Sequence, residues 1–435
     1  MASGPFVAIR KVAQDLKNFA IAGPTLSLDM GGPVRRMRHI GVDPHSLGEK
    51  KAYELIFAKQ VQVETIQGGC PVYDINRDFY EKFGEYSSRF NLLPSYSDKR
   101  HKLMDNPKTV DLSKIDEKSE FRRASEIAKR PGFTVSIEEF NGFDRFVGTR
   151  KFYSLIHTPK GRVPKGGFPF AMIIPGLGTV AHMYEPIAKL LANLGYKVMT
   201  VDRPPDMLLD IMVQGLSIAF YAAVHAGGMK DVAVKCQRNI IMGLSEGAAR
   251  APSIQAISRM QRELSLGPNL PFFPNGVFFS GPYYMREMYF NLEKLSSAED
   301  TPQVLKSVMK MCRDLGIERK KTDSEFWWEI EPRLFVPMLR RDALGALWKD
   351  TRNLVIGGLD DPVVPFSQPL RLWADLNMLK VKTSELAAIP GPGIHPLPTA
   401  VKSMGLKNYL EKTLSGTMQM SALTLQFIEA TRELK

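Results

Sequence analysis

Short apolar runs alternate with helical stretches from residue 168 to residue 358, and this alternation restricts the fold more than any other feature of the sequence. The runs lie at Phe168–Ile174, Gly195–Pro204 including an exit turn, Asn239–Met242, Gly276–Gly281 and Asn353–Gly358. Strands in a parallel sheet are covered on both faces by crossover helices, so they are apolar throughout instead of alternating. The sequence therefore predicts an α/β fold with a mostly parallel central sheet flanked by helices. Functional loops are expected at the carboxyl ends of its strands.

One of these runs is followed by Gly243-Leu244-Ser245-Glu246-Gly247 and an alanine-rich segment that is suited to a helix. A strand that turns directly into a helix lifts the serine hydroxyl clear of the sheet. Small residues are required on both sides of the turn, and Gly243 and Gly247 provide them. Ser245 is therefore a candidate nucleophile, with a residue in an ordinary tight turn as the alternative interpretation.

Two later loops carry a candidate acid and a candidate base. Hydrolysis by serine needs a base for the hydroxyl proton and an acid that orients the base. Asp361 follows the apolar run Asn353–Gly358, and His395 lies on a loop rich in glycine and proline. Asp361 could instead cap the next helix, which leaves Asp360 as the second candidate acid. His395 is the histidine that follows both aspartates, and the earlier histidines are expected to be structural, although His182 is a candidate for lining the pocket.

With these motifs the chain closely resembles the α/β-hydrolase superfamily over roughly residues 132–415. Gly243–Gly247 resembles its nucleophile elbow, Gly358–Pro365 its acid turn, and Gly393–Pro396 its histidine loop. The resemblance favours Asp361 over Asp360 as the acid. It implies an esterase-like or lipase-like serine hydrolase with an oxyanion hole made by the backbone N–H groups of Leu177 and Glu246. The chain departs from the family at Pro175-Gly176, where His-Gly is frequent.

No metal or organic cofactor is expected. Cys70, Cys236 and Cys312 are far apart and have no Cys-x-x-Cys spacing, so they indicate neither a metal site nor a disulfide framework. This use of cysteine is typical of a reducing compartment. The expected location is therefore intracellular, in the cytoplasm or the mitochondrial matrix.

Five segments are expected along the chain. Residues 1–131 form a helical or irregular N-terminal extension, and 132–281 form the first part of the core, beginning with an antiparallel hairpin that turns at Asn141–Asp144. Residues 282–350 form a helical insertion, 351–415 form the second part of the core, and 416–435 form a C-terminal helix after a break at Ser415-Gly416. The insertion is rich in methionine and tryptophan, including Trp327 and Trp328. It is interpreted as a cap over an apolar acyl pocket, or as a helical subdomain with its own core.

The formal net charge of +12 raises the question of an acidic partner. The excess is spread thinly, and the densest basic cluster is Arg35–His39. A nucleic-acid partner is therefore disfavoured without being excluded, and a small-molecule acyl ester is the expected substrate. The alternative is a hydrolase fold retained as a structural or binding subunit of a larger mitochondrial or ribonucleoprotein assembly, joined through residues 1–131.

No apolar run is long enough to predict a transmembrane helix. Residues 5–21 carry a short apolar stripe with nearby basic residues. That pattern fits a mitochondrial transit peptide or the first helix of the fold, and the first helix is favoured because arginine is sparse.

Overall fold

The computed structural model of the chain describes residues 102–144, 148–176, 179–202, 218–219, 221–264, 270–283, 288, 291, 293, 351–378, 383–395 and 405–433. The strands are β1 (Phe133–Asp144), β2 (Gly148–Pro159), β3 (Phe170–Ile174), β4 (Lys197–Val201), β5 (Ile240–Leu244), β6 (Asn275–Phe279), β7 (Arg352–Gly358) and β8 (Thr383–Ile389). The helices are α6 (Glu117–Ala128), α7 (Glu185–Asn193), α9 (Glu246–Leu264), α14 (Ser367–Met378) and α16 (Leu406–Arg432), with 3-10 turns η1 (Leu112–Lys114) and η2 (Ala181–Tyr184).

These strands form one eight-stranded sheet in the order β1-β2-β4-β3-β5-β6-β7-β8. β1 pairs with β2, and β2 with β4, in antiparallel fashion, whereas every other neighbouring pair is parallel. All residues of β3, β4, β5 and β6 are buried, as expected for strands covered on both faces. The predicted fold class, a mostly parallel sheet flanked by helices, is confirmed.

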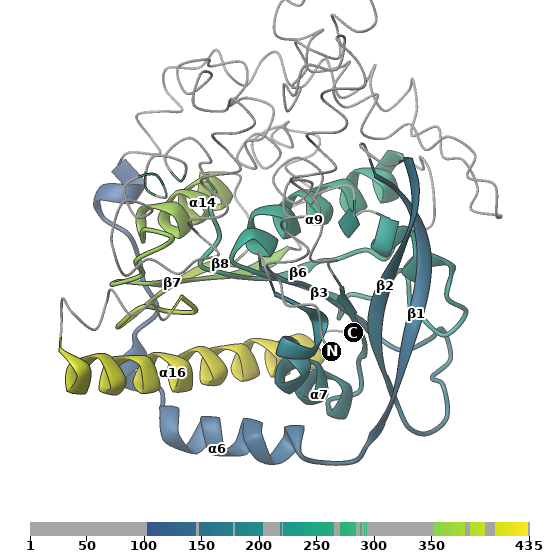
Figure 1. The fold of residues 1–435 in the computed structure, drawn as a ribbon, viewed down its shortest axis with the longest axis horizontal. Coiled ribbons are helices and arrows are strands. Elements are labelled where there is room, and N and C mark those ends of the chain that lie inside the picture. The colour runs from purple at the N-terminus through teal and green to yellow at the C-terminus, as the bar shows by residue number, and fades with distance from the viewer. Residues whose placement is uncertain are drawn as a thin grey trace, which may run out of the picture.

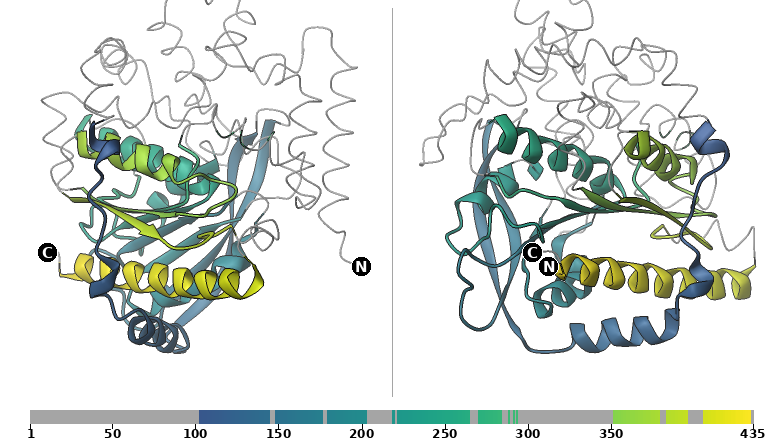
Figure 2. Two further views of the ribbon diagram at one scale, coloured as in Figure 1. Left: turned by 90° about the vertical axis from the view of Figure 1, so that its left-hand side faces the viewer. Right: turned by 180° about the vertical axis from the view of Figure 1, so that it is seen from behind.

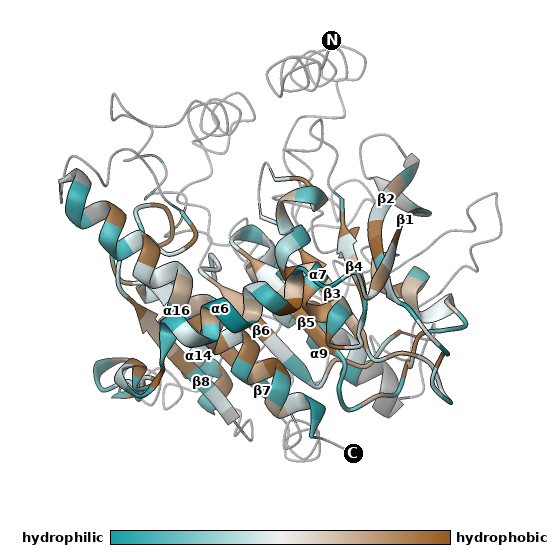
Figure 3. Ribbon diagram, turned by 90° about the horizontal axis from the view of Figure 1, so that it is seen from below, coloured by the Kyte–Doolittle hydropathy of each residue, from teal (hydrophilic) through white to brown (hydrophobic). Residues whose placement is uncertain are grey.

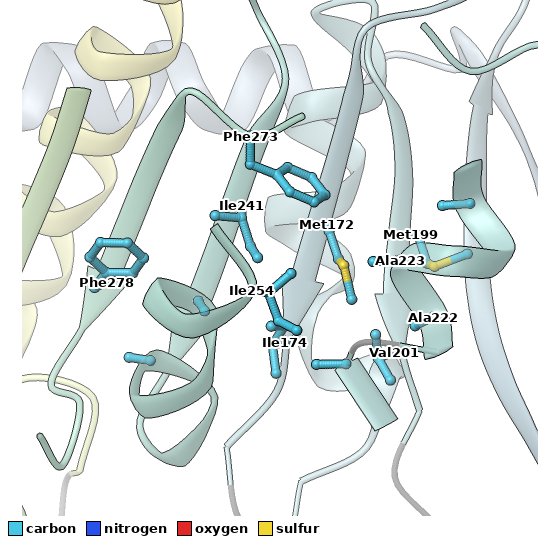
Figure 4. Packing of buried hydrophobic residues seen from close by; sticks show 14 of the residues in the cluster. Met172, Ile174, Met199, Val201, Ala222, Ala223, Ile241, Ile254, Phe273 and Phe278 are labelled. Carbon is cyan, nitrogen blue, oxygen red and sulfur yellow. The ribbon is translucent and has the colours of Figure 1, made fainter. Parts of the chain in front are cut away.

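Helices cover the sheet on both faces, as Figures 1 and 2 show. On one face, Ile254 of α9 shares a buried apolar cluster with Met172, Ile241 and Phe278 of the strands (Figure 4). Leu372 of α14 belongs to the same cluster. On the other face, α7 and α16 pack against the opposite sides of the same strands. Each fully buried aliphatic or aromatic side chain stabilises the fold by about 1.5–3 kcal/mol, so these two layers hold the sheet in place. In Figure 3, β3 and β5 are mostly hydrophobic, whereas α16 carries both kinds of residue.

The expected hairpin at the start of the sheet is present, but its turn was predicted at the wrong place. Asn141–Asp144 belong to β1, and the pairing continues from Asn141↔Lys151 to Asp144↔Gly148. Cross-strand pairing with β2 outweighs the turn preference of Asn141-Gly142, because strand preference depends strongly on context. Residues 145–147, which join the two strands, lie outside the described part.

α16 contradicts the predicted break at Ser415-Gly416, because the helix continues from Leu406 to Arg432 without interruption. Gly416 lies where the helix meets the loop after β8, and a Cβ added there would come within 2.8 Å of the Pro390 carbonyl oxygen. The glycine therefore allows the helix to approach this backbone closely instead of ending it.

α6 precedes the predicted start of the core at residue 132 and nevertheless packs onto it. Its residues Ala124 and Ile127 are buried in the layer formed with α7 and α16. Arg123 makes an ion pair with Glu429 of α16, and Ser415 donates a hydrogen bond to Glu117. The packed part of the chain therefore begins N-terminal to the predicted boundary.

Several sequence predictions concern residues outside the described part of the chain. These are residues 1–101, nearly all of the insertion 282–350 with its tryptophans, and the two cysteines Cys70 and Cys312. Among the helices that are described, none is both long enough and apolar enough to cross a membrane.

Candidate active site

The turn between β5 and α9 holds Ser245 in a strained conformation. β5 ends at Leu244, α9 begins at Glu246, and Ser245 between them has φ 53°. A positive φ is uncommon for any residue except glycine and is typical of functional turns. A Cβ at Gly247 would lie 2.0 Å from the Ile174 carbonyl oxygen, and one at Gly243 would lie 2.4 Å from the Gly247 carbonyl oxygen. Both glycines are therefore required for β3, β5 and α9 to pack this closely.

His395 lies between Ser245 and Asp361, at the carboxyl ends of the parallel strands. Its Nε2 is 2.7 Å from Ser245 Oγ, and its Nδ1 is 2.8 Å from Asp361 Oδ2. A carboxylate only accepts hydrogen bonds, so Nδ1 carries the proton that faces Asp361 and Nε2 is left to accept the serine proton. The structure thus brings together the three residues that the sequence nominated, in hydrogen-bonding contact.

The Asp361 carboxylate uses both oxygens. Oδ1 accepts hydrogen bonds from the backbone N–H groups of Val363, at 3.0 Å, and Val364, at 2.9 Å, while Oδ2 faces His395. The side chain is fully buried, whereas the His395 side chain is 14% exposed. Val363 and Val364 lie in the turn before α14, which begins at Ser367, so Asp361 holds this turn with one oxygen and contacts His395 with the other, and the helix cap left as an alternative is not observed.

Asp360 does not contact His395. Its Oδ2 accepts hydrogen bonds from the Gly391 N–H group, at 3.2 Å, and from Lys412 Nζ, at 2.9 Å. The Asp360 N–H group also donates to the Gly391 carbonyl oxygen over 3.0 Å. Asp360 therefore connects the acid loop to the histidine loop and to α16.

The histidine loop follows β8 and depends on two glycines. Gly391 and Gly393 have φ values of 82° and 60°, which lie in the left-handed region that favours glycine. A Cβ at Gly358 would come within 2.6 Å of the Gly393 nitrogen, so the acid and histidine loops touch through their backbones. This contact places His395 beside the end of β7.

One of the two nominated oxyanion donors lies within the described part. Glu246 begins α9, and the N–H groups in the first turn of a helix have no carbonyl partner within that helix. Leu177 and its neighbour Gly178 lie outside the described part. Gly176 lies against the nucleophile, since a Cβ there would be 3.0 Å from Ser245 Cβ.

The other described histidines lie outside this arrangement. His182 is exposed and its Nδ1 lies 3.1 Å from Glu185 Oε1. His157 is completely buried and His225 is partly buried, and burial lowers the pKa of both rings. Within the described part, no group of three or more His, Cys, Asp or Glu side chains could hold a metal ion.

Sequence reasoning missed three residues that shape the site. Ser280, at the end of β6, has φ 41°, and its Oγ would lie 3.2 Å from a Cβ added at Gly393. Tyr184 and Thr179 bond to each other and to Gly176 near the nucleophile. The sequence Phe279-Ser280-Gly281 is a weak turn signal that could have identified Ser280. No local sequence pattern identifies Tyr184.

The topology and the site together decide the fold. A mostly parallel sheet, a strained serine at a strand-to-helix turn, and an acid and a histidine that follow it in that order define one architecture. The chain has the α/β-hydrolase fold. Its antiparallel β1 and β2 lie at one edge of the sheet, and the candidate site lies at the carboxyl ends of β5, β7 and β8.

Comparisons with known proteins return α/β-hydrolase structures at low identity. No protein-family model matches the chain, and no curated protein matches it. Among solved structures, the acylaminoacyl peptidase of Pyrococcus horikoshii is 15% identical, with a TM-score of 0.45; the match covers 69% of this chain and 42% of that protein. A thermostable esterase of Pseudomonas putida is 14% identical, with a TM-score of 0.42, over 75% of this chain and 95% of the esterase. Carboxyl esterase 2 of Tuber melanosporum is 14% identical, with a TM-score of 0.40, over 67% of this chain and 87% of that one.

Proposed function

We propose that this chain is a serine hydrolase that cleaves a carboxylic ester or thioester through an acyl-enzyme. One observation carries the proposal: Asp361, His395 and Ser245 form a continuous chain of hydrogen bonds of 2.8 and 2.7 Å. A serine in an ordinary tight turn has no need of a histidine and a buried carboxylate in line with it. The strained backbone at Ser245 supports the same conclusion.

In the first step, Ser245 Oγ attacks the carbonyl carbon of the substrate while His395 Nε2 removes the hydroxyl proton. The carbonyl electron pair moves onto the oxygen to give a tetrahedral intermediate, and Asp361 stabilises the imidazolium through Nδ1–H. Collapse of the intermediate expels the alcohol or thiol, which takes the proton from His395. The acyl group remains bound to Ser245 as an ester.

In the second step, His395 removes a proton from water, and the resulting hydroxide attacks the acyl carbon. The carboxylic acid leaves, and Ser245 Oγ recovers its proton from His395. Both tetrahedral intermediates carry a negative oxygen, which is stabilised by the backbone N–H groups of Glu246 and Leu177. Glu246 is suited to this because the partial positive charge at a helix N-terminus favours an anion.

The proposed acyl chain is apolar and of moderate to long length. The support comes from the insertion, whose methionines and tryptophans would form an apolar wall. Within the described part, Met288 at the start of the insertion packs against Val363 and Val364, directly after Asp361. Apolar side chains therefore begin next to the acid loop.

The test is hydrolysis of p-nitrophenyl esters and matching thioesters from acetyl to palmitoyl, measured for the wild type and Ser245→Ala. We expect the variant to lose all activity above background, and kcat/KM of the wild type to rise with acyl length. Ser421→Ala is the matched control. The Ser421 hydroxyl donates to the Thr417 carbonyl oxygen one turn earlier in α16. A wild type no faster than Ser245→Ala on every substrate would contradict the proposal.

A further inference from the structure

A closed ring of hydrogen bonds connects the loop after β3 with the residue that precedes α7. The Gly176 N–H group donates to the Tyr184 hydroxyl oxygen over 3.0 Å, and this oxygen lies 2.8 Å from Thr179 Oγ1. Thr179 Oγ1 in turn lies 2.7 Å from the Gly176 carbonyl oxygen. The ring therefore uses both backbone polar groups of Gly176 and two side-chain hydroxyls.

The direction of every bond in the ring follows from the chemistry of its members. A carbonyl oxygen cannot donate, so the Thr179 hydroxyl donates its proton to Gly176. Because Thr179 has already donated its only hydroxyl proton, the bond between the two hydroxyls must be donated by Tyr184 to Thr179 Oγ1. Tyr184 accepts from the Gly176 N–H group with its oxygen. Each hydroxyl thus donates once and accepts once, an arrangement in which neighbouring bonds strengthen one another.

The ring acts on the backbone that touches the nucleophile. A Cβ at Gly176 would lie 3.0 Å from Ser245 Cβ and 3.2 Å from the Leu244 carbonyl oxygen, so Gly176 is in close contact with the elbow. Thr179 N–H also lies 3.4 Å from the Gly176 carbonyl oxygen, which closes a turn across the loop. A further bond, from Ala181 N–H to Asp202 Oδ1 at 3.0 Å, attaches the following turn to the end of β4.

Pro175, which precedes Gly176, leaves the loop dependent on hydrogen bonds from other residues. Pro175 has no N–H group and no polar side chain, so it cannot hold the loop by a hydrogen bond of its own side chain. Tyr184 is partly buried and packs against the apolar layer formed with α7 and α16, which fixes its ring. The hydroxyl is therefore presented to the loop from a rigid base.

We propose that Tyr184 and Thr179 are positioning residues that hold the Gly176 backbone against Ser245 in the geometry that the oxyanion requires. The proposal rests on the hydrolase function proposed above. A preorganised donor is effective only when it lies in the position where the negative oxygen develops. Loss of either hydroxyl leaves the loop free to shift, so it slows the chemical step more than it weakens substrate binding.

The variants remove one hydroxyl at a time without changing side-chain size. We expect Tyr184→Phe and Thr179→Val each to lower kcat for p-nitrophenyl butyrate by about tenfold, with KM changed less than about twofold. This is a smaller loss than the roughly 100- to 1000-fold caused by removing an oxyanion donor outright. Thr179→Ser keeps the hydroxyl and should retain at least about half of the wild-type kcat. The double variant should be about as slow as each single variant, because the ring fails as a unit.

Two controls remove similar hydroxyls elsewhere. Thr417→Val breaks a bond to the Thr413 carbonyl oxygen on the exposed side of α16, and Tyr153→Phe alters an exposed tyrosine on β2. Both should leave kcat unchanged. Equal losses in the controls would show a general effect on stability and would overturn the proposal.

A second measurement tests, without any substrate, whether the ring of hydrogen bonds protects the Gly176 amide. Amide hydrogen exchange of the peptide containing Gly176 should be about 5- to 10-fold faster in Tyr184→Phe, since one net hydrogen bond is worth about 1 kcal/mol. Unchanged exchange would overturn the proposal, and so would faster exchange with an unchanged kcat. If the wild type hydrolyses no ester, the hydrolase function fails and the catalytic part of this inference fails with it. The exchange rates still decide separately whether the ring holds the loop.

Discussion

At the scale of single residues, two adjacent aspartates at the end of β7 make entirely different contacts. Asp361 faces His395 from a buried position, whereas Asp360 binds Gly391 and Lys412 near the surface. Neighbouring residues in a turn point in different directions, so the same functional group meets a different environment at each position. This contrast provides a test with closely matched variants.

We predict that Asp361→Asn lowers kcat/KM by about 10⁴-fold, because an amide at this position stabilises the wrong tautomer of His395. Asp360→Asn should reduce kcat/KM by less than about fivefold. Its main effect should be on stability, at about 1 kcal/mol or less, since a partly exposed ion pair contributes little. Steady-state kinetics and urea unfolding of both variants give the answer. Equal activity losses would mean that Asp361 has no special part in the reaction.

The elbow glycines give a second prediction at this scale. A Cβ at Gly247 would lie 2.0 Å from a backbone oxygen of β3, which cannot move without disrupting the sheet. Gly247→Ala should therefore lower the free energy of unfolding by more than about 2 kcal/mol. A Cβ at Gly228 would meet nothing within 4 Å, so Gly228→Ala is the matched control. Unfolding curves that coincide for the two variants would show that the elbow is packed loosely enough to accept a methyl group.

At the scale of elements, the strands were predictable and the last helix was not. Buried parallel strands are apolar over nearly continuous runs, and this local pattern located β3, β4, β5, β6 and β7 to within a few residues. Gly416 is ordinarily a sign that a helix ends, but the contact with Pro390 that explains it comes from β8, which is distant in sequence. The ring around Gly176 escaped prediction for the same reason, because nothing in the sequence near Tyr184 says where its hydroxyl points.

Gly416 also yields a prediction for α16. Glycine costs a helix interior about 1 kcal/mol relative to alanine, so an isolated helix would gain from Gly416→Ala. In the folded protein the new Cβ would lie 2.8 Å from the Pro390 carbonyl oxygen, a backbone atom of the loop that leads to His395. We expect the steric clash to outweigh the gain in helix propensity, so that the free energy of unfolding of the variant falls by about 1 kcal/mol. An increase in stability, measured by thermal unfolding, would indicate that the loop moves aside easily.

At the scale of the whole molecule, a buried and a partly buried histidine connect stability to pH. His157 is completely buried beside Phe133, and neither ring nitrogen has a hydrogen-bond partner within the described part. Burial lowers the pKa of His157; the charge of Glu185 raises it by a smaller amount, and the charge of Lys189 lowers it further. Burial also lowers the pKa of His225, which Glu138 partly offsets. The folded state therefore binds these protons less readily than the unfolded state does.

The stabilisation is complete above the unfolded pKa of about 6.5 and is lost as the pH falls from there to the lowered folded pKa. We predict that the free energy of unfolding falls between about pH 7.5 and pH 5.5, and that His157→Leu shows a smaller fall. Urea unfolding at about pH 7.5 and pH 5.5 measures how much the free energy of unfolding of each protein changes with pH. A variant at position 157 with the wild-type slope would refute the assignment.

The most direct test of the central claim, an activated serine at the turn between β5 and α9, is covalent labelling with a fluorophosphonate probe. The purified protein and Ser245→Ala are treated in parallel, and the modified peptide is identified by mass spectrometry. The probe reacts only with a serine that is accessible and activated by its base. We predict labelling at Ser245 in the wild type and none in the variant. A folded wild type that stays unlabelled, or a label that persists in Ser245→Ala, would contradict the proposed function.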